Sequence, residues 1–237
     1  MRKQIIYQKT GRLRFVGHLD FMRTMHRAMT RAGIPLAYSQ GFNPHPHMSF
    51  AGPLTLGWDG LGEIMEIKTE KDISDTELLQ SLSRELPEGI RLLGCQTLDE
   101  KEPPIMAKIQ VAAYRIDLPE ERDWTEPVNE FLSQESIRLT KIGKIKGRKQ
   151  EVEVEVRPWI YSWTLTDPHT LELVCASGSE QNLKPDLLIY ALYRFIGAED
   201  LKYREHITRC SLFGRDPQGN LINYSDPGAA SGRKELA

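Results

Sequence analysis

The sequence predicts an α+β fold of two tandem ferredoxin-like units, each with the order β-α-β-β-α-β, followed by a disordered C-terminal tail. Segments with the hydrophobic periods of strands and helices follow one another in this order in the first half and return in the second half. From Gly214 onward the residues are polar and rich in Gly, Pro and Ser, a composition typical of disorder. The expected domains are 1–98 and 105–213, and the flexible tail is 214–237.

The first half opens with expected strands at residues 3–8 and 12–16. From His18 to Ala32 the apolar residues recur at spacings of three and four, which indicates an amphipathic helix. Gly33 is expected to end this helix, because glycine readily adopts the left-handed conformation that follows many helix C-termini.

Two strands, a helix and a final strand complete the first half. The segments "HMSFA" and "LGEIMEIKT" have the composition of strands. Ser74 and Glu77 form a capping box ahead of a leucine-rich stretch, so a helix is expected to begin there. The strand "GIRLLGCQTL" follows, and the charged, proline-paired segment 99–104 is expected to be a linker.

The second half repeats this order less regularly. We expect strands at 107–117, 136–142, 151–164, 170–176 and 203–212, and helices near 127–134 and at 185–196. In "EVEVEV" valine and glutamate alternate, as in a strand with one buried face. Pro185 suits the first turn of the last helix.

Composition indicates a cytoplasmic protein with no cofactor of its own. Of the 237 residues 40% are hydrophobic and 27% are charged, and no apolar run reaches the roughly 18 residues of a membrane span. The N-terminal stretch lacks the apolar core of a signal peptide. Cys95, Cys175 and Cys210 are far apart, so we expect neither a disulfide framework nor a zinc module.

Charge is unevenly distributed, although the net charge is only −2. Residues 1–50 carry eight basic side chains against Asp20 alone, a local charge of +7. Residues 51–103 carry twelve acidic and five basic side chains, a local charge of −7. A chain divided in this way can present a basic face to an anionic partner.

The predicted first helix carries a row of arginines. Arg23, Arg27 and Arg31 are four residues apart and therefore share one face, which can contact successive phosphates. A solvated helix face, with Asp20 paired to Arg23, would carry the same pattern without any such contact. A second basic cluster at 141–149 can either clamp a nucleic-acid backbone or serve solubility alone.

A loop dense in hydrogen-bonding groups follows this helix in "YSQGFNPHPHMSF", residues 38–50. Gly41, Asn43 and the prolines are expected to fix its shape, with Phe42 anchored in the core. Its polar side chains would then remain as donors and acceptors, although a purely structural crossover has the same composition. The candidate binding residues are Arg14, His18, Asp20, Arg23, Arg27, Arg31, Ser39, Gln40, Gly41, Phe42, Asn43, His45 and His47.

Catalysis and metal binding have little support in the sequence. It contains no G-x-S-x-G nucleophile elbow, no P-loop and no H-E-x-x-H zinc motif. His18 and His26 are eight residues apart on one helix, about 12 Å of rise, which is too far to share a metal ion directly. We therefore assign no catalytic residue and no metal site.

The run from residue 7 to residue 57 closely resembles the radical-SAM-associated proteins, a family of unknown function. In that family the segment reads K-x-G-x-x-R-F-x-S-H-L-D, then R-A-x-R-R-A-x-x-P, then S-x-G-F-N-P-H-P, and this chain has "KTGRLRFVGHLD", "RAMTRAGIP" and "SQGFNPHP". The later segments "VEVRPWI" and "CSLFG" look like further landmarks of the family. Gly17 stands in place of the usual serine, and Thr30 in place of a frequent arginine.

This resemblance implies an accessory protein that binds RNA beside a radical S-adenosylmethionine enzyme, in RNA modification or processing. The partner would carry S-adenosylmethionine and the iron–sulfur cluster, because this chain lacks the closely spaced cysteines that hold such a cluster. Two alternatives stay open at this point. One is a metal-independent ribonuclease that uses His18 or His45, and the other is a protein–protein adaptor for the same partner.

Overall fold

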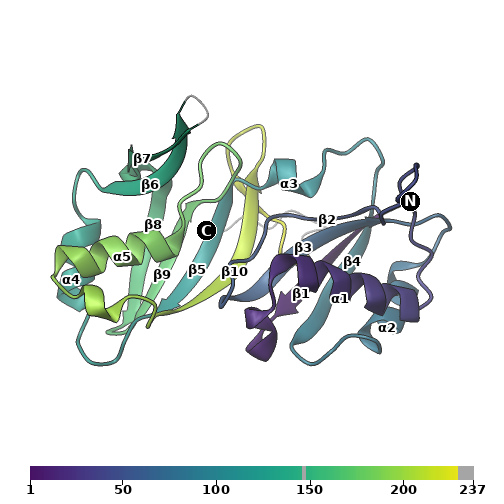
Figure 1. The fold of residues 1–237 in the computed structure, drawn as a ribbon, viewed down its shortest axis with the longest axis horizontal. Helices are drawn as coiled ribbons and strands as arrows, with labels where there is room; N and C mark the ends of the chain where they lie inside the picture. Colours follow the sequence, from purple (N-terminus) through teal and green to yellow (C-terminus); the bar gives the residue numbers. More distant parts are fainter. Residues whose placement is uncertain (146–147, 229–237) are drawn as a thin grey trace. The chain divides into compact units, whose positions relative to one another are not determined.

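The structure, a computed structural model, describes residues 1–145 and 148–228, which form two compact units (Figure 1). The first unit contains residues 1–110 together with the chain from Thr208 onward, and the second contains residues 111–207. The sequence predicts that the strand at 203–212 belongs to the second domain, whereas in the structure the chain from Thr208 lies in the first unit.

The first unit contains the predicted order β-α-β-β-α-β. Its elements are β1 (Arg2–Lys9), α1 (His18–Arg31), β2 (Met48–Phe50), β3 (Asp59–Lys68), α2 (Asp75–Ser83) and β4 (Ile90–Leu98). β1 pairs antiparallel with β4 on one side and β3 on the other, and β2 pairs antiparallel with β3. The capping box is confirmed at the start of α2, where the Glu77 amide donates to Ser74 Oγ at 3.2 Å.

Between β1 and α1 the structure differs from the prediction. Residues Gly11–Phe15 form a short 3-10 helix, η1, in place of the strand expected at 12–16. Gly11 has a φ of +63°, a left-handed conformation that turns the chain out of the sheet directly after β1. At the other end of α1, Gly33 has a φ of +69° and ends the helix as expected.

The core of the first unit lies between one face of the sheet and the two helices. Alternation along β1 directs Ile5 and Tyr7 toward the helices, where they pack with Phe21 and Met25 of α1 and Leu78 of α2. The rings of Tyr7 and Phe21 stack with their centroids 5.6 Å apart. Each buried side chain of this size stabilises the fold by about 1.5–3 kcal/mol.

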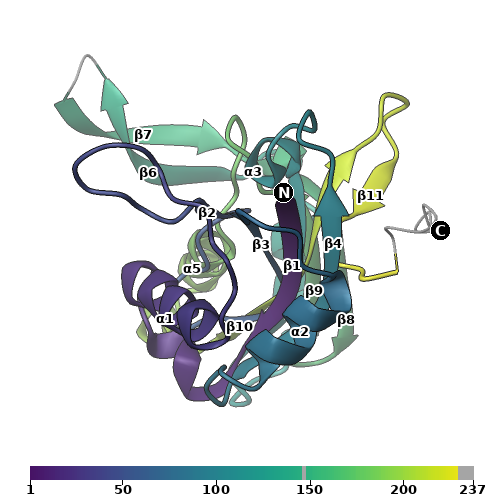
Figure 2. The same ribbon diagram turned by 90° about the vertical axis from the view of Figure 1, so that its right-hand side faces the viewer.

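The opposite face of this sheet is covered by the last described residues of the chain. β10 (His206–Arg215) runs parallel to β3, and β11 (Leu221–Asn223) pairs antiparallel with β10. Figure 2 shows α1 and β11 on opposite sides of β1. Residues 214–228 are therefore folded, and the disordered tail predicted for 214–237 does not hold for them. Residues 229–237 lie outside the described part of the chain.

Two glycines of the sheet make room for this covering segment. A Cβ on Gly62 would lie 2.5 Å from the Cβ of Ser225, and a Cβ on Gly94 would lie 2.8 Å from the Cβ of Pro227. Ser225 is buried, and its Oγ donates to the Gly62 carbonyl and accepts from the Leu212 amide. Close approach of the backbone to the covering segment is thus possible only without a side chain at these positions.

The second unit combines a three-stranded antiparallel sheet, ordered β5-β9-β8, with two helices and a separate two-stranded ladder of β6 and β7. Its elements are β5 (Val111–Asp117), α4 (Thr125–Leu132), β6 (Arg138–Ile145), β7 (Arg148–Glu155), η2 (Arg157–Trp159), β8 (Ile160–Asp167), β9 (Thr170–Ala176), α5 (Pro185–Phe195) and η3 (Glu199–Leu201). Pro185 begins α5, as its fixed backbone angle predicts.

Two predictions for the later strands need correction. The single strand expected at 151–164 is split, because the 3-10 turn η2 separates β7 from β8. The strand expected at 107–117 begins at Val111, after the short helix α3 (Ile105–Lys108). The alternation in "EVEVEV" is confirmed, since its glutamates are exposed and Val156 is buried. The mixed α+β class holds, whereas a tandem ferredoxin-like repeat is not established.

The helices of this protein are short. The longest in the described ranges is α1, with 14 residues. In residues 1–145 and 148–228 no helix is both long and apolar enough to cross a membrane.

We expect Gly62→Ala to loosen the covering segment from the sheet. The added methyl group would meet the Ser225 side chain and the Cys210 carbonyl at less than 3 Å. Overpacking of this kind costs about 1–3 kcal/mol, so the free energy of unfolding in urea should fall by that amount. Limited proteolysis should then cleave residues 216–228 faster than in the wild type.

Gly17→Ser is the matched control for this experiment. Gly17 has a φ of −62° and no atom within 4 Å of an added Cβ, and it occupies the N-cap of α1. A serine there should add a few tenths of a kcal/mol through capping and leave cleavage unchanged. Equal cleavage of Gly62→Ala and wild type would contradict the close packing described above.

Candidate functional site

Three arginines share the exposed face of α1, as their spacing predicts. The buried stripe of this helix consists of Phe21, Met25, Ala28 and Met29. The side chains of Arg23 and Arg31 are 65% and 53% exposed, and Arg27 is exposed as well. The guanidinium groups are therefore accessible along the outer side of the helix.

Two of these arginines pair with carboxylates. Arg23 Nη1 lies 2.8 Å from Asp20 Oδ1, and Arg31 Nε lies 2.8 Å from Glu85 Oε2. Over residues 1–145 and 148–228, Arg27 makes no hydrogen bond or ion pair. Exposed ion pairs contribute about 0–1 kcal/mol, so an incoming anion can compete for all three guanidinium groups.

The other basic residues of the N-terminal segment do not extend this face. Lys3 and Lys9 are only 1% and 3% exposed. Arg14 Nη1 lies 3.6 Å from Asp59 Oδ2, so its charge is balanced locally. The local charge of +7 is thus partly buried and partly neutralised. The second predicted cluster, at 141–149, has side chains that lie outside the described residues.

The loop after α1 is closed by its own hydrogen bonds. The Ser39 amide donates to the His45 carbonyl at 2.8 Å, and the His45 amide donates to Ser39 Oγ at 3.0 Å. The His47 amide donates to the Ala37 carbonyl at 2.8 Å. At the tip Gly41 has a φ of +123°, which a side chain would disfavour. These bonds make residues 38–46 a compact loop.

Phe42 is not the core anchor that the sequence predicts, because its side chain is fully exposed at the tip of this loop. The backbone bonds between Ser39 and His45 hold the loop, so its shape does not depend on a buried ring. Gln40, Asn43 and His45 are exposed as well. The loop therefore presents one aromatic ring among several donors and acceptors.

A contact between His26 and Tyr38 joins α1 to the loop. His26 Nε2 lies 2.9 Å from Tyr38 Oη, and the two rings meet edge to face with their centroids 6.0 Å apart. His26 is not among the predicted site residues, yet it fixes the loop beside the arginine row. We call the resulting patch the α1–loop surface, and it consists of Arg23, Arg27, Arg31, Tyr38, Gln40, Phe42, Asn43 and His45.

The histidines of this region do not gather as metal ligands. His18 begins α1 and packs edge-on against Phe50, with ring centroids 5.3 Å apart. Burial, and then the positive charge of Lys9, lower the pKa of His18 below its ordinary value of 6.5. Among the described residues no group of three or more His, Cys, Asp or Glu side chains could hold a metal ion.

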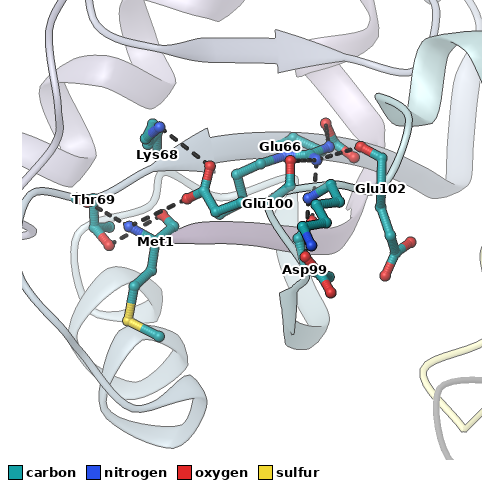
Figure 3. Close-up of polar contacts among 9 residues, drawn as sticks. Met1, Glu66, Lys68, Thr69, Asp99, Glu100 and Glu102 are labelled. Atoms are coloured by element: carbon teal, nitrogen blue, oxygen red, sulfur yellow. Dashed lines mark hydrogen bonds and ion pairs between the residues drawn. The ribbon is translucent and has the colours of Figure 1, made fainter.

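His47 faces a different neighbourhood, a cavity of about 320 Å³ beside the start of the chain. Arg2, Glu66 and Lys68 supply most of its charged lining. Arg2 Nη2 donates to Glu66 Oε2 at 3.0 Å, and Arg2 Nη1 donates to the Glu102 carbonyl at 2.5 Å. Figure 3 shows how Glu66, Lys68 and the carbonyls of the 99–102 segment surround the first residues. These contacts occupy the Arg2 guanidinium.

Sequence reasoning missed a buried group of charges near His18. Glu63 Oε1 accepts from Arg209 Nε at 2.8 Å, and Glu63 Oε2 accepts from Arg209 Nη2 at 2.5 Å. Lys9 Nζ donates to the Val16 carbonyl at 2.9 Å. Burial lowers the pKa of Lys9, and the charge of Glu63 opposes that shift. Only the fold brings these residues of β1, β3 and β10 together.

We expect an NMR titration to place the pKa of His18 below 6.5. Lys9→Met removes the neighbouring charge, so the pKa of His18 should rise toward 6.5 in that variant. Because the unfolded chain binds this proton more tightly than the folded one, the contribution of neutral His18 to stability is complete above pH 6.5. It declines as the pH falls from 6.5 through the lowered pKa.

Arg12→Met is the control for the Lys9 substitution, since Arg12 is an exposed cation of η1. It should leave the pKa of His18 where it stands in the wild type. An unchanged pKa of His18 in Lys9→Met would show that burial alone causes the shift.

Comparison with known proteins gives a family match. The family described as "Uncharacterized protein conserved in bacteria (DUF2344)" matches residues 2–185, which spans the α1–loop surface and most of the second unit. No curated protein matches the chain.

Proposed function

The chain belongs to the DUF2344 family of uncharacterized bacterial proteins, and we propose that this member binds single-stranded RNA through the α1–loop surface. We further propose that it acts as an accessory protein beside a radical S-adenosylmethionine enzyme. The family description names no activity, so the support comes from the chemistry of the surface and from the resemblance of residues 7–57 to radical-SAM-associated proteins.

The observation that carries the proposal is the exposed ring of Phe42 on a closed loop. A large apolar side chain held in water is unfavourable unless a partner covers it. An unstacked base is a suitable partner, since base–aromatic stacking contributes about 1–3 kcal/mol and tolerates every base. Because hydrogen bonds already fix the loop, little conformational entropy is lost on binding.

The arginine row supplies the contacts to the backbone of the nucleic acid. The guanidinium group of Arg27 can bind a phosphate directly. Arg23 and Arg31 can do so by exchanging their exposed carboxylate partners for a phosphate. The same carboxylates, Asp20 and Glu85, compete with the ligand. The expected binding is therefore moderate in affinity and sensitive to salt.

In this proposal the partner enzyme, and not the present chain, holds the iron–sulfur cluster. A cysteine binds iron as the thiolate, and burial raises the pKa of both Cys95 and Cys175 to about 12. These two residues also belong to different units of the chain. The present protein would hold an RNA segment on the α1–loop surface while the partner modifies it.

We expect Phe42→Ala to weaken binding of a single-stranded RNA about tenfold, as the loss of one stacked base predicts. Phe42→Trp keeps a stacking ring and should bind like the wild type. Arg27→Glu should weaken binding of all sequences and lower the slope of log K against log salt by roughly one phosphate contact, about 0.7. Fluorescence anisotropy at several salt concentrations measures both effects.

Arg91→Glu is the control, because Arg91 is an exposed arginine of β4 whose strand neighbours Ile90 and Leu92 pack toward the helices, so Arg91 points to the opposite face of the sheet. It should reduce affinity much less than Arg27→Glu. RNA binding that is absent, or that does not respond to salt, would sink the proposal. Co-purification with a radical S-adenosylmethionine protein without any RNA would then favour the adaptor function.

A second candidate function has one specific observation in its favour. The lowered pKa keeps the His18 imidazole neutral at pH 7, which is the form that a general base requires. A metal-independent ribonuclease would use this residue, with His45 as the other proposed acid–base group.

This alternative predicts cleavage of labelled RNA in EDTA. His18→Ala should abolish that cleavage, while Phe42→Ala should only slow it through weaker binding. An RNA that stays intact with the wild-type protein in EDTA would remove the ribonuclease from consideration.

A further inference from the structure

A polar cavity of about 360 Å³ lies on the face of the first unit's sheet that points away from α1 and α2. Gln4 of β1 and Gln96 of β4 line it from the sheet, and Asn223, Tyr224 and Asp226 line it from the covering segment. All of its lining residues belong to the first unit. The cavity therefore exists only because residues 221–228 fold back over the strands.

Gln4 is the group in this cavity that most needs explanation. Its side chain is 2% exposed, and across the described residues its Nε2 has no hydrogen-bond partner. A buried donor without an acceptor is unfavourable and is rare in folded proteins. A hydrophobic side chain would suit the fold better, so a ligand that offers an acceptor accounts for the glutamine.

The charges around the cavity disfavour an anion. Lys108 Nζ is paired with Glu102 Oε2 at 2.5 Å, which cancels both charges. Asp226 accepts a hydrogen bond from the Gly228 amide at 2.8 Å, and within the described residues it has no ion-pair partner. A phosphate would meet this carboxylate, whereas a neutral ligand with a hydrogen-bond donor would be stabilised by it.

The remaining lining groups match the edge of a heterocycle. The amides of Gln4 and Gln96 each carry a donor and an acceptor side by side, the arrangement that pairs with adjacent acceptor and donor atoms of a base. Asn223 Oδ1 already accepts from the Ser225 amide at 2.9 Å, so Asn223 offers its Nδ2 as a donor. Tyr224 adds an aromatic ring. The volume is at the lower end of the range for ligand pockets, about 300–1,000 Å³, which fits one small ring system.

From the unpaired buried amide of Gln4 in this amide-lined cavity, we infer that the back of the sheet is a binding site for a neutral nucleobase. The base can belong to a free nucleoside or to an unstacked nucleotide of an RNA. The site is separate from the α1–loop surface, because β11, which supplies Ile222 and Asn223 to its lining, lies on the other side of β1 from α1 (Figure 2). It therefore does not depend on the function proposed for that surface.

The test is isothermal titration calorimetry with two kinds of probe. One arm uses adenosine, guanosine, cytidine and uridine, and the other uses single-stranded RNA hexamers of each base. The wild type should bind at least one probe with a Kd below about 1 mM. Gln4→Met keeps the length of the side chain and removes its amide, so the affinity for that probe should fall about tenfold or more.

Gln8→Met is the matched control, since Gln8 lies on the same strand outside the cavity and should leave affinity unchanged. Asn223→Ala provides a second test from the covering segment, independent of the sheet, and should also weaken binding. Circular dichroism confirms that each variant is folded. If a nucleoside binds and both Gln4→Met and Asn223→Ala weaken its binding, the site belongs to a small ligand. If hexamers bind and nucleosides do not, and the same variants weaken hexamer binding, the site belongs to RNA.

Two results would overturn the inference. One is that no nucleoside binds the wild type and that no hexamer binds a double variant in which Phe42→Ala and Arg27→Glu weaken the α1–loop surface. The other is that Gln4→Met and Asn223→Ala bind every probe as tightly as the wild type does. Loss of hexamer binding in Phe42→Ala but not in Gln4→Met would support the proposed function while rejecting this second site.

Discussion

The buried pair of Glu63 and Arg209 is the interaction on which the first unit depends. The two residues are 146 positions apart in sequence, yet they share two hydrogen bonds with side chains only 3% and 6% exposed. Removing one partner of such a pair leaves an unpaired buried charge and costs about 3–5 kcal/mol. The pair fixes β10 beside β3, and β10 in turn carries the segment that covers the back of the sheet.

Local signals allowed much of this fold to be predicted from the sequence. The period of α1, its end at Gly33 and the cap at Ser74 all depend on residues within a few positions of one another, and each of them is found in the structure. The fate of residues 214–228 depends instead on distant glycines, Gly62 and Gly94, which no local pattern connects to the C-terminal segment. The buried pair of Glu63 and Arg209 likewise joins residues that no local pattern connects.

The candidate site shows the same division. The arginine row follows from a spacing of four residues and could be predicted, because helical geometry alone determines the shared face. The exposure of Phe42 could not be predicted, since an aromatic residue in a loop is more often buried. Here the bonds between Ser39 and His45 hold the loop without a buried ring. Gln4 could not be predicted as a site residue, because a single glutamine in a strand forms no sequence pattern that indicates binding.

The first unit consists of residues 1–110 and the chain from Thr208, and this division affects how the unit folds during synthesis on the ribosome. At a synthesis rate of about 5–20 residues per second, the 97 residues of the second unit delay the partner of Glu63 by about 5–20 seconds. During that interval the Asp59–Gly60 end of β3 lacks its β10 partner, and the carboxylate of Glu63 lacks Arg209. The incomplete sheet of the nascent chain therefore has to be protected from aggregation, close to the ribosomal exit tunnel or by a chaperone, until the last strands have been synthesised.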